Sequence, residues 1–378
     1  MALTNTVLWH QTPLLHSESI TSRLGCDVYL KLEIFQPSQS FKYRGQAFFV
    51  QEALKQHGPD VHLVIASSGN AALALAHVCQ TLHVKCTVFL PSEAAKKNML
   101  DTLDRLAVNL IVVPGEYYAD ALVKAMEFVA TDKNIVLAPT YDHPALWKGI
   151  SSMISEVAEQ LPKATSPPDA IVCSVGGGSM LTGTLLGCAE QGWDDVHVVA
   201  LETQGADAFY HSVLSTESAS FVLPRGITTH VSPEHEITIA TLPEVTSCVT
   251  SLGATSSAGT TIKMAVERRA SGHGGLTCVT IPDESSMQTC LDFADDTKLL
   301  VELAASTTLT PAYSSVLFDS IFGDTMKPVS GRRRSIVFIV CGGFKISPTD
   351  LETYRVHLLQ TSGVARVAWV NGRSVPLS

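Results

Sequence analysis

The residues best suited to do chemistry stand in three short loops. Lys42 lies in the segment SFKYRG at residues 40–45, SSGNA occupies residues 67–71, and GGGS occupies residues 176–179. A lysine amine can form a Schiff base with an aldehyde cofactor. Loops of Gly, Ser and Asn at the start of a helix bind anions through their backbone N–H groups. The combination predicts a site in which a lysine and two anion-binding loops act together.

Each of the three segments has a plainer interpretation when taken alone. A lysine at the start of a helix is commonly a surface residue, SSGNA can serve as an ordinary helix cap, and a glycine triplet is weak evidence for a phosphate site. The GGGS segment lacks the GxGxxG spacing, which excludes a Rossmann dehydrogenase, and the chain has no GxxxxGK[ST] motif. The inference therefore rests on the combination of the three segments.

Strand and helix patterns alternate along the chain and place each loop beside a predicted element. Buried strands separated by helices favour parallel sheets with helices on both faces, and there are enough strands for two sheets. The predicted strands are residues 27–32, 62–66, 86–90, 109–113, 170–174, 197–201 and 335–340. The predicted helices are residues 45–56, 71–82, 96–106, 118–131, 151–161, 180–191 and 255–271. Residues 212–243 and 323–334 lack periodicity and are predicted to be surface excursions.

Composition and charge restrict the class of protein. The chain has 378 residues, 46% of them hydrophobic and 16% charged, with a net charge of −10. This length favours two domains, and the negative charge argues against binding to nucleic acid. The nine cysteines form no CxxC pair, so neither a zinc cluster nor a secreted disulfide framework is expected. With no signal peptide and no apolar run of membrane length, the sequence predicts a soluble cytoplasmic protein with no membrane partner.

Four segments in a fixed order resemble one enzyme family. Lys42 within SFKYRG, Asn70 within SSGNA, GGGS, and CGG at residues 341–343 resemble the fold-type II pyridoxal-phosphate enzymes. Among these, the chain is most similar to the serine/threonine dehydratase family of the L-serine dehydratase type. The resemblance runs from about residue 12 to about residue 358 and includes YDHPALWKG at residues 141–149. It implies pyridoxal 5'-phosphate as the cofactor.

The resemblance also implies an α/β fold with two domains, of the tryptophan synthase β type. Each domain is expected to be an open, twisted, mostly parallel sheet flanked by helices. Residues 1–38 and 146–378 are expected to form the large domain that binds pyridoxal phosphate. Residues 39–145 are expected to form the small domain, which carries Lys42 and the SSGNA loop. The resemblance places the active site in the cleft between the domains and gives the large domain the contact of a homodimer.

Around the pyridine ring, the resemblance assigns roles to four side chains. Lys42 is expected to hold the cofactor covalently and, once released, to remove the α-proton of the substrate. Phe41 and Ser251 are expected to pack against opposite faces of the ring. Cys341 stands where a partner of the pyridine nitrogen is expected, and a thiol is a poorer proton donor than a carboxylic acid. A weak electron sink of this kind favours β-elimination over transamination.

The same resemblance assigns the binding of the substrate and of the cofactor phosphate to the two anion-binding loops. Asn70 is expected to hydrogen-bond the ring hydroxyl and, with Ser67 and Ser68, to bind the substrate. The residues expected to wrap the cofactor phosphate are Gly176, Gly177, Gly178, Ser179 and Met180. Ser68 also suits an acid/base role on the face opposite Lys42, which makes it a candidate catalytic residue and is what racemisation requires.

A cation site is implied less directly. In the family it would use the carboxylate of Glu202 with the carbonyl groups of Ala206, Leu252 and Ala254. Residue 208 is alanine and offers no side-chain oxygen. A monovalent ion such as potassium is therefore expected in preference to a tightly held divalent ion.

The expected reaction is the dehydration and deamination of L-serine, L-threonine or a close β-hydroxy amino acid to a 2-oxo acid and ammonia. Two alternatives stay open among enzymes, namely a serine or hydroxyaspartate racemase/dehydratase, supported by Ser68, and a β-replacement enzyme acting on an activated serine. A non-catalytic ligand-binding relative is the alternative from another class, and the intact Lys42 and GGGS argue against it. The sequence leaves the physiological substrate, the pathway and the role of residues 212–243 undetermined.

Overall fold

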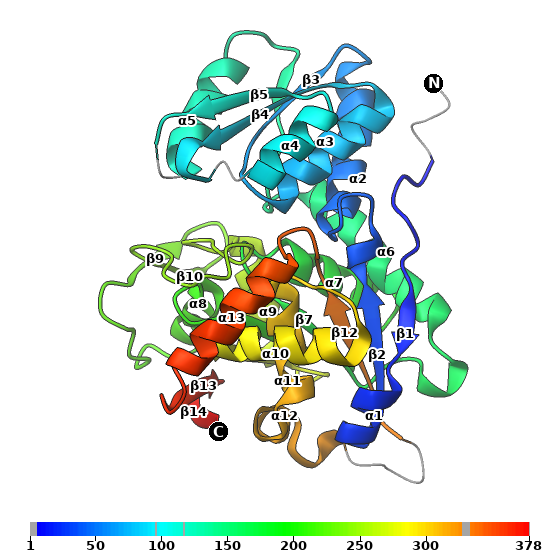
Figure 1. Cartoon of the computed structure of the whole chain (residues 1–378), viewed down its shortest axis with the longest axis vertical. Coiled ribbons are helices and arrows are strands. Elements are labelled where there is room, and N and C mark those ends of the chain that lie inside the picture. The colour runs from blue at the N-terminus through cyan, green and yellow to red at the C-terminus, as the bar shows by residue number, and fades with distance from the viewer. Residues whose placement is uncertain (1–5, 95–96, 116–117, 327–332, 378) are drawn as a thin grey trace. The chain divides into compact units, whose positions relative to one another are not determined.

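The computed structural model describes residues 6–94, 97–115, 118–326 and 333–377. Within it the chain divides into two compact units (Figure 1). Unit 1 contains the described residues up to Gln11 together with Phe35–Ser152. Unit 2 contains Thr12–Ile34 and the described chain from Met153 onward. The predicted small domain, residues 39–145, falls within unit 1.

Unit 1 is built on a four-stranded parallel sheet in the order β5–β4–β3–β6. Its strands are β3 (His62–Ala66), β4 (Lys85–Pro91), β5 (Asn109–Val113) and β6 (Ile135–Leu137). Its helices are α2 (Lys42–His57), α3 (Asn70–Leu82), α4 (Lys97–Arg105) and α5 (Tyr118–Val129), and α6 (Pro144–Gln160) begins here and continues into unit 2. All four strands run in one direction, so their carboxyl ends share one edge of the sheet.

Apolar side chains explain why β3 and α3 form the centre of unit 1. Four of the five residues of β3 are buried. Helix α3 buries its alanines and leucines along most of its length, because small side chains let the helix approach β3, β4 and α2 closely. The first residue of α3 is Asn70, so the anion loop before it is attached to a rigid, buried helix.

Unit 2 contains an eight-stranded mixed sheet in the order β1–β2–β12–β7–β8–β11–β13–β14. The central strands from β2 to β11 are parallel, and the outer pairs at each end are antiparallel. The strands are β1 (Leu14–His16), β2 (Asp27–Leu32), β7 (Ala170–Ser174), β8 (His197–Thr203), β11 (Leu276–Ile281), β12 (Ser335–Val340), β13 (Arg366–Val370) and β14 (Arg373–Leu377). Every residue of β7, β11 and β12 is buried, as expected of parallel strands covered on both faces.

Helices cover this sheet along much of its area (Figure 1). They are α1 (Glu18–Leu24), α7 (Ser179–Glu190), α8 (Ala208–Glu217), α9 (Gly259–Ala270), α10 (Asp283–Thr297), α11 (Leu303–Tyr313), α12 (Ser315–Phe322) and α13 (Pro348–Gln360). Helix α11 packs against β7 and β12, α7 packs against β7, and α9 packs against β11. No helix in the described part of the chain is both long enough and apolar enough to cross a lipid bilayer.

The prediction of an irregular excursion at residues 212–243 is wrong in part. The segment begins inside α8 and contains a two-stranded hairpin of β9 (Thr228–Ser232) and β10 (Ile237–Thr241). Four of the five residues of β9 are exposed, so the strand carries no alternation of buried and exposed residues for a sequence pattern to show. In the second predicted excursion, residues 323–326 form a 3-10 turn and residues 327–332 lie outside the described part of the chain.

The predicted chemistry lies at the carboxyl ends of parallel strands. SSGNA follows β3, the glycine loop follows β7, and Cys341 follows β12. Ligands of open parallel sheets bind outside the carboxyl ends of the strands. The predicted fold class, parallel sheets flanked by helices, is confirmed.

Candidate active site

Lys42 is the first residue of α2 in unit 1. Its Nζ donates a hydrogen bond to the carbonyl oxygen of Thr140 at 2.8 Å. The same nitrogen lies 5.2 Å from the centroid of the Phe41 ring, and Phe41 is buried. Because the base of the side chain is fixed on a helix and its tip by a carbonyl group, the amine has a defined position, as a covalent attachment site requires.

In unit 1, the SSGNA loop leaves the backbone start of α3 without a side-chain cap. The N–H of Ser67 donates to the carbonyl of Phe89 at 3.0 Å, and the N–H of Gly69 donates to the hydroxyl of Ser67 at 3.2 Å. Gly69 is the N-cap of α3, and glycine has no side chain with which to cap the first N–H groups of the helix. Such a helix start suits a carboxylate or phosphate, and Ser68 and Asn70 lie directly beside it.

The glycine loop in unit 2 is held through its carbonyl groups. The hydroxyl of Ser257 donates to the carbonyl of Gly176 at 2.8 Å, and the N–H of Ala258 donates to the carbonyl of Gly177 at 3.1 Å. In a trans peptide the N–H points opposite to the C=O. The N–H groups of Gly177 and Gly178 therefore point away from Ser257 and Ala258, both toward the other side of the loop.

Two of the loop positions admit only glycine. A Cβ atom at Gly176 would lie 2.9 Å from the Cα of Leu252, and one at Gly178 would lie 2.2 Å from the hydroxyl of Thr261. Gly178 also has a φ of +108°, a region that residues with a side chain rarely adopt. Gly178 is the N-cap of α7, so the positive end of that helix lies behind the loop. This cradle of backbone amides fits the phosphate of pyridoxal phosphate.

Cys341 lies at the end of β12, nearly fully buried, with its Sγ 3.9 Å from the hydroxyl of Ser174 at the end of β7. Burial first, and then the nearby Glu302 carboxylate, raise the pKa of the Cys341 thiol well above its usual range. The thiol is therefore protonated and neutral at physiological pH. A neutral thiol beside the parallel strand ends fits the role of a weak partner for a pyridine nitrogen.

Ser251 is brought to the same strand end by Glu302. The hydroxyl of Ser251 donates to Oε2 of Glu302 at 3.2 Å, and the N–H of Glu302 donates to the carbonyl of Gly342, the residue after Cys341, at 3.1 Å. The Glu302 side chain is buried. Glu302 was not among the residues predicted for the site, because no sequence motif links it to Ser251, 51 residues earlier in the chain.

The predicted cation ligand Glu202 is already bonded to backbone amides. Its two carboxylate oxygens accept from the N–H groups of Phe209 at 3.0 Å and Tyr210 at 2.6 Å. Burial, followed by the charge of Asp207, raises the pKa of Glu202 well above its usual range. The carbonyl of Leu252 accepts from the N–H of Ala254 at 2.8 Å. Among the described residues, no group of three or more His, Cys, Asp or Glu side chains could hold a metal ion.

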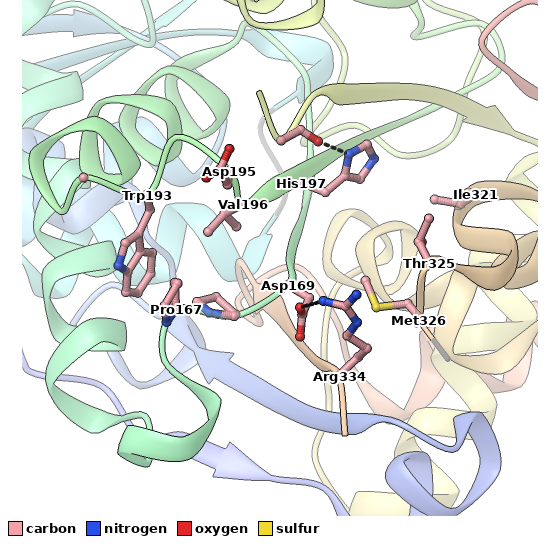
Figure 2. A pocket seen from close by; sticks show the side chains of 13 residues that line it. Pro167, Asp169, Trp193, Asp195, Val196, His197, Ile321, Thr325, Met326 and Arg334 are labelled. Carbon is pink, nitrogen blue, oxygen red and sulfur yellow. Dashed lines mark hydrogen bonds and ion pairs between the residues drawn. The ribbon is translucent and has the colours of Figure 1, made fainter. Parts of the chain in front are cut away.

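A pocket of about 430 Å³ lies at the opposite edge of the unit 2 sheet (Figure 2). Asp169 precedes β7, His197 begins β8 and Arg334 precedes β12, so the pocket borders the amino ends of these strands. Asp169 and Arg334 pair at 2.5 Å, and His197 bonds the carbonyl of Gly274 at 2.6 Å (Figure 2). None of the predicted site residues lines it, and we assign it no part in the chemistry.

The fold and these loops define a class of protein, the fold-type II pyridoxal-phosphate enzymes. Comparison with known proteins confirms this class. A family model described as pyridoxal-phosphate dependent enzyme matches residues 6–342. The rat protein "Serine dehydratase-like" is 32% identical over 347 residues, which cover 92% of this chain and 94% of the rat protein. The human "L-serine dehydratase/L-threonine deaminase" is 31% identical over 355 residues, covering 93% of this chain and 96% of the human protein.

A solved structure agrees with these relatives. The crystal structure of an L-serine ammonia-lyase from the fungus Rhizomucor miehei superimposes with a TM-score of 0.77 at 29% identity, covering 93% of this chain and 99% of that chain. The chain therefore belongs to the pyridoxal-phosphate dependent enzyme family, in its serine/threonine dehydratase group. The family and the cofactor predicted from the sequence are confirmed.

A replacement of Cys341 by alanine tests the role of the thiol. We expect Cys341→Ala to keep the affinity for pyridoxal phosphate within about threefold, because the loop amides supply that binding, while the rate of turnover changes by roughly tenfold. The absorption spectrum of the bound cofactor and the ratio of products measure the effect. Cys278→Ala, which removes a buried thiol from β11, is the matched control and should leave the spectrum unchanged. A spectrum and product ratio unaltered by Cys341→Ala would contradict the assignment.

Proposed function

We propose that this chain is an ammonia-lyase for L-serine, L-threonine or a close β-hydroxy amino acid. The substrate loses its β-hydroxyl as water, and the enamine that is released hydrolyses to a 2-oxo acid and ammonia. The observation that carries the proposal is a lysine fixed at the start of α2 in a chain whose glycine loop has two N–H groups turned away from the residues that bind its carbonyls. Relatives named for this reaction, at 31% and 32% identity over most of the chain, support the substrate class.

Three groups of residues have separate roles in the proposed reaction. Bound pyridoxal phosphate withdraws electrons from the α-carbon of an amino acid joined to it. The Nζ of Lys42 takes the proton from that α-carbon. The start of α3, with Ser67, Ser68 and Asn70, binds and orients the α-carboxylate. The amides of the glycine loop, with Ser179 and Met180 at the start of α7, hold the phosphate.

Cys341 would affect how strongly the bound cofactor withdraws electrons from the α-carbon. Its thiol keeps its own proton, because burial and Glu302 oppose ionisation. Cys341 would offer the pyridine nitrogen of the cofactor a neutral hydrogen-bonding partner and would not transfer its proton to it. With Cys341 as its partner, the bound cofactor would be a weak electron acceptor, which would favour loss of the β-hydroxyl over return of a proton to the α-carbon. This favours elimination over racemisation and transamination.

Ser68 supports the rival function, a racemase/dehydratase. It lies half-buried beside the start of α3, where helix N–H dipoles stabilise negative charge on its oxygen. A hydroxyl so placed can give a proton to the second face of the substrate. No comparable feature favours a β-replacement enzyme. We therefore retain racemisation as a minor activity of the same site.

The replacement Ser68→Ala separates the two activities. We expect elimination from L-serine to fall by no more than about tenfold, while any action on D-serine falls by about 100-fold, because only the second face needs the hydroxyl. Chiral analysis of the amino acid that remains, run beside 2-oxo acid release, measures both. Ser67→Ala is the comparison variant: Ser67 bonds Gly69 and is assigned to the carboxylate that both isomers share, so its loss should affect both isomers to the same extent. Equal losses for both isomers in Ser68→Ala would overturn this role.

The monovalent cation expected from the sequence belongs to the same proposal. Glu202 is the candidate anion, with the carbonyl groups of Ala206, Leu252 and Ala254 as neutral ligands. Because residue 208 is alanine and adds no side-chain oxygen to this set, we favour a potassium-like ion over a tightly held divalent one. The expected homodimer and cytoplasmic location are likewise proposals. The nine cysteines, all of them free thiols in the structure, support a reducing compartment.

The absorption spectrum of the purified protein tests the proposal. The account expects a band of cofactor joined to a lysine, a change of that band on addition of L-serine, and attachment at Lys42 after borohydride reduction and peptide mapping. A protein that binds pyridoxal phosphate but shows no spectral response to L-serine, L-threonine or another β-hydroxy amino acid would contradict it.

A further inference from the structure

The tip of the β9–β10 hairpin is fixed by its own turn. The N–H of His235 donates to the hydroxyl of Ser232 at 3.3 Å, and the N–H of Glu236 donates to the carbonyl of Ser232 at 2.8 Å. Glu236 adopts a left-handed φ of +56°, which closes the turn. Ser232 is buried, although the other four residues of β9 are exposed. The turn therefore holds His235 in one place at the end of a largely exposed hairpin.

The imidazole of His235 lies against the first residue of α9, Gly259. The three atoms nearest to a Cβ placed at Gly259 all belong to His235, namely Cδ2 at 2.1 Å, Nε2 at 2.8 Å and Cγ at 3.3 Å. Gly259 is buried, and its φ lies outside the left-handed region, so its backbone alone does not demand glycine. Any side chain at Gly259 would force the imidazole of His235 to shift, because the imidazole occupies that space.

The residues around Gly259 hold the glycine loop. Ser257 and Ala258, directly before it, donate the hydrogen bonds to the carbonyls of Gly176 and Gly177. Thr261, two residues after it, lies against Gly178 and shares a hydrogen bond of 2.7 Å with the hydroxyl of Thr182 on α7. The start of α9 thus contacts the loop on both sides of the position that His235 covers.

We propose that the β9–β10 hairpin braces the phosphate loop, with His235 as a positioning residue for the cofactor phosphate. The contact presses the start of α9 toward the loop, and α9 in turn sets the direction of the loop amides. Amides that must converge on one phosphate lose affinity when they diverge, even though no contact with the phosphate itself is removed. The inference rests on the proposed function only through the assignment of the glycine loop to the phosphate.

The affinity of the full-length chain for pyridoxal phosphate and the ³¹P chemical shift of the bound phosphate test the brace. His235→Ala should weaken the affinity roughly tenfold and move the ³¹P line, the size of effect seen when a supporting contact is lost. His235→Phe keeps an aromatic ring in the same space, so its affinity for pyridoxal phosphate should stay within about twofold of that of the unaltered chain. His230→Ala, at an exposed position of the same hairpin, is the matched control and should change neither quantity.

A double replacement gives the sharper result. Gly259→Ala should weaken the affinity by clearly more than His235→Ala does, because its Cβ meets the imidazole and displaces the start of α9. Adding His235→Ala should bring the affinity back to that of His235→Ala alone, within about twofold. A double variant as weak as Gly259→Ala, or a His235→Ala variant with unchanged affinity and an unchanged ³¹P line, would overturn the brace. Gly178→Ala separates this failure from that of the proposed function, because unchanged affinity in Gly178→Ala removes the phosphate from the loop itself.

Discussion

Lys42→Ala should abolish covalent attachment of the cofactor and lower turnover by at least about a thousandfold. The amine is needed twice, to hold the cofactor and to take the α-proton, and a positioned general base alone contributes about 10²–10⁴-fold. Its position on the first turn of α2, with Nζ bonded to Thr140, gives it a fixed place for both tasks. Turnover of L-serine and borohydride trapping of the cofactor measure the two losses separately.

The control for this replacement lies on the same helix. Lys55 is partly exposed near the end of α2 and pairs with Glu52 at 2.8 Å. Lys55→Ala should leave cofactor attachment and turnover unchanged, because an exposed pair of this kind contributes little. A reduced adduct mapped to any lysine other than Lys42 in the unaltered protein would contradict the assignment.

Gly178→Ala should lower the affinity for pyridoxal phosphate by about 100-fold. Alanine at a φ of +108° is strained by about 1–3 kcal/mol, and its Cβ would also overlap the hydroxyl of Thr261. The loop can relieve both only by turning its amides away from their common direction. Equilibrium titration of the full-length chain with the cofactor measures the loss.

Gly192→Ala is the matched control for Gly178→Ala. Gly192 has a φ of +67°, but no described atom lies within 4 Å of a Cβ placed there. The control therefore carries backbone strain of a similar kind at the far end of α7, without the overlap and away from the loop. We expect it to cost stability while keeping cofactor affinity. Equal affinities in Gly178→Ala and the unaltered chain would remove the loop from the phosphate site.

Sequence patterns gave the buried centre of both sheets and little of their edges. The predicted strands at 27–32, 62–66 and 170–174 coincide with β2, β3 and β7, because buried parallel strands are continuous apolar runs. The predicted strand at 109–113 coincides with the edge strand β5, whose sequence is apolar although only Val113 is buried. The outer strands β1, β13 and β14 were missed, since they are short or partly exposed. β11 was missed although all six of its residues are buried.

The helices between residues 283 and 322 were also missed. They are rich in Ser and Thr, and α11 contains Pro311, a residue that breaks most helical patterns. Tertiary packing stabilises them, because α10 and α11 pack on each other and α11 packs on the sheet. Such tertiary contacts cannot be predicted from local sequence patterns.

In the candidate site, too, some residues could be predicted from the sequence and others could not. Lys42, Asn70 and the glycine loop stand in contiguous motifs, so the sequence alone marks them as candidates. Ser257 contacts the loop from about 80 residues further along the chain, and His235 lies against Gly259 beside it; only the folded structure brings these residues together. Residues that position a site are harder to predict than residues that form it, because their contacts are made across the fold.

The release of 2-oxo acid and ammonia from L-serine and L-threonine tests the central claim most directly. The purified protein, loaded with pyridoxal phosphate, is incubated with each amino acid, and 2-oxo acid, ammonia and the remaining D- and L-isomers are measured together. The account predicts equal amounts of 2-oxo acid and ammonia, with the D-isomer a minor product and all products absent in Lys42→Ala. Accumulation of the D-isomer faster than the 2-oxo acid, or consumption of substrate with no 2-oxo acid, would contradict it.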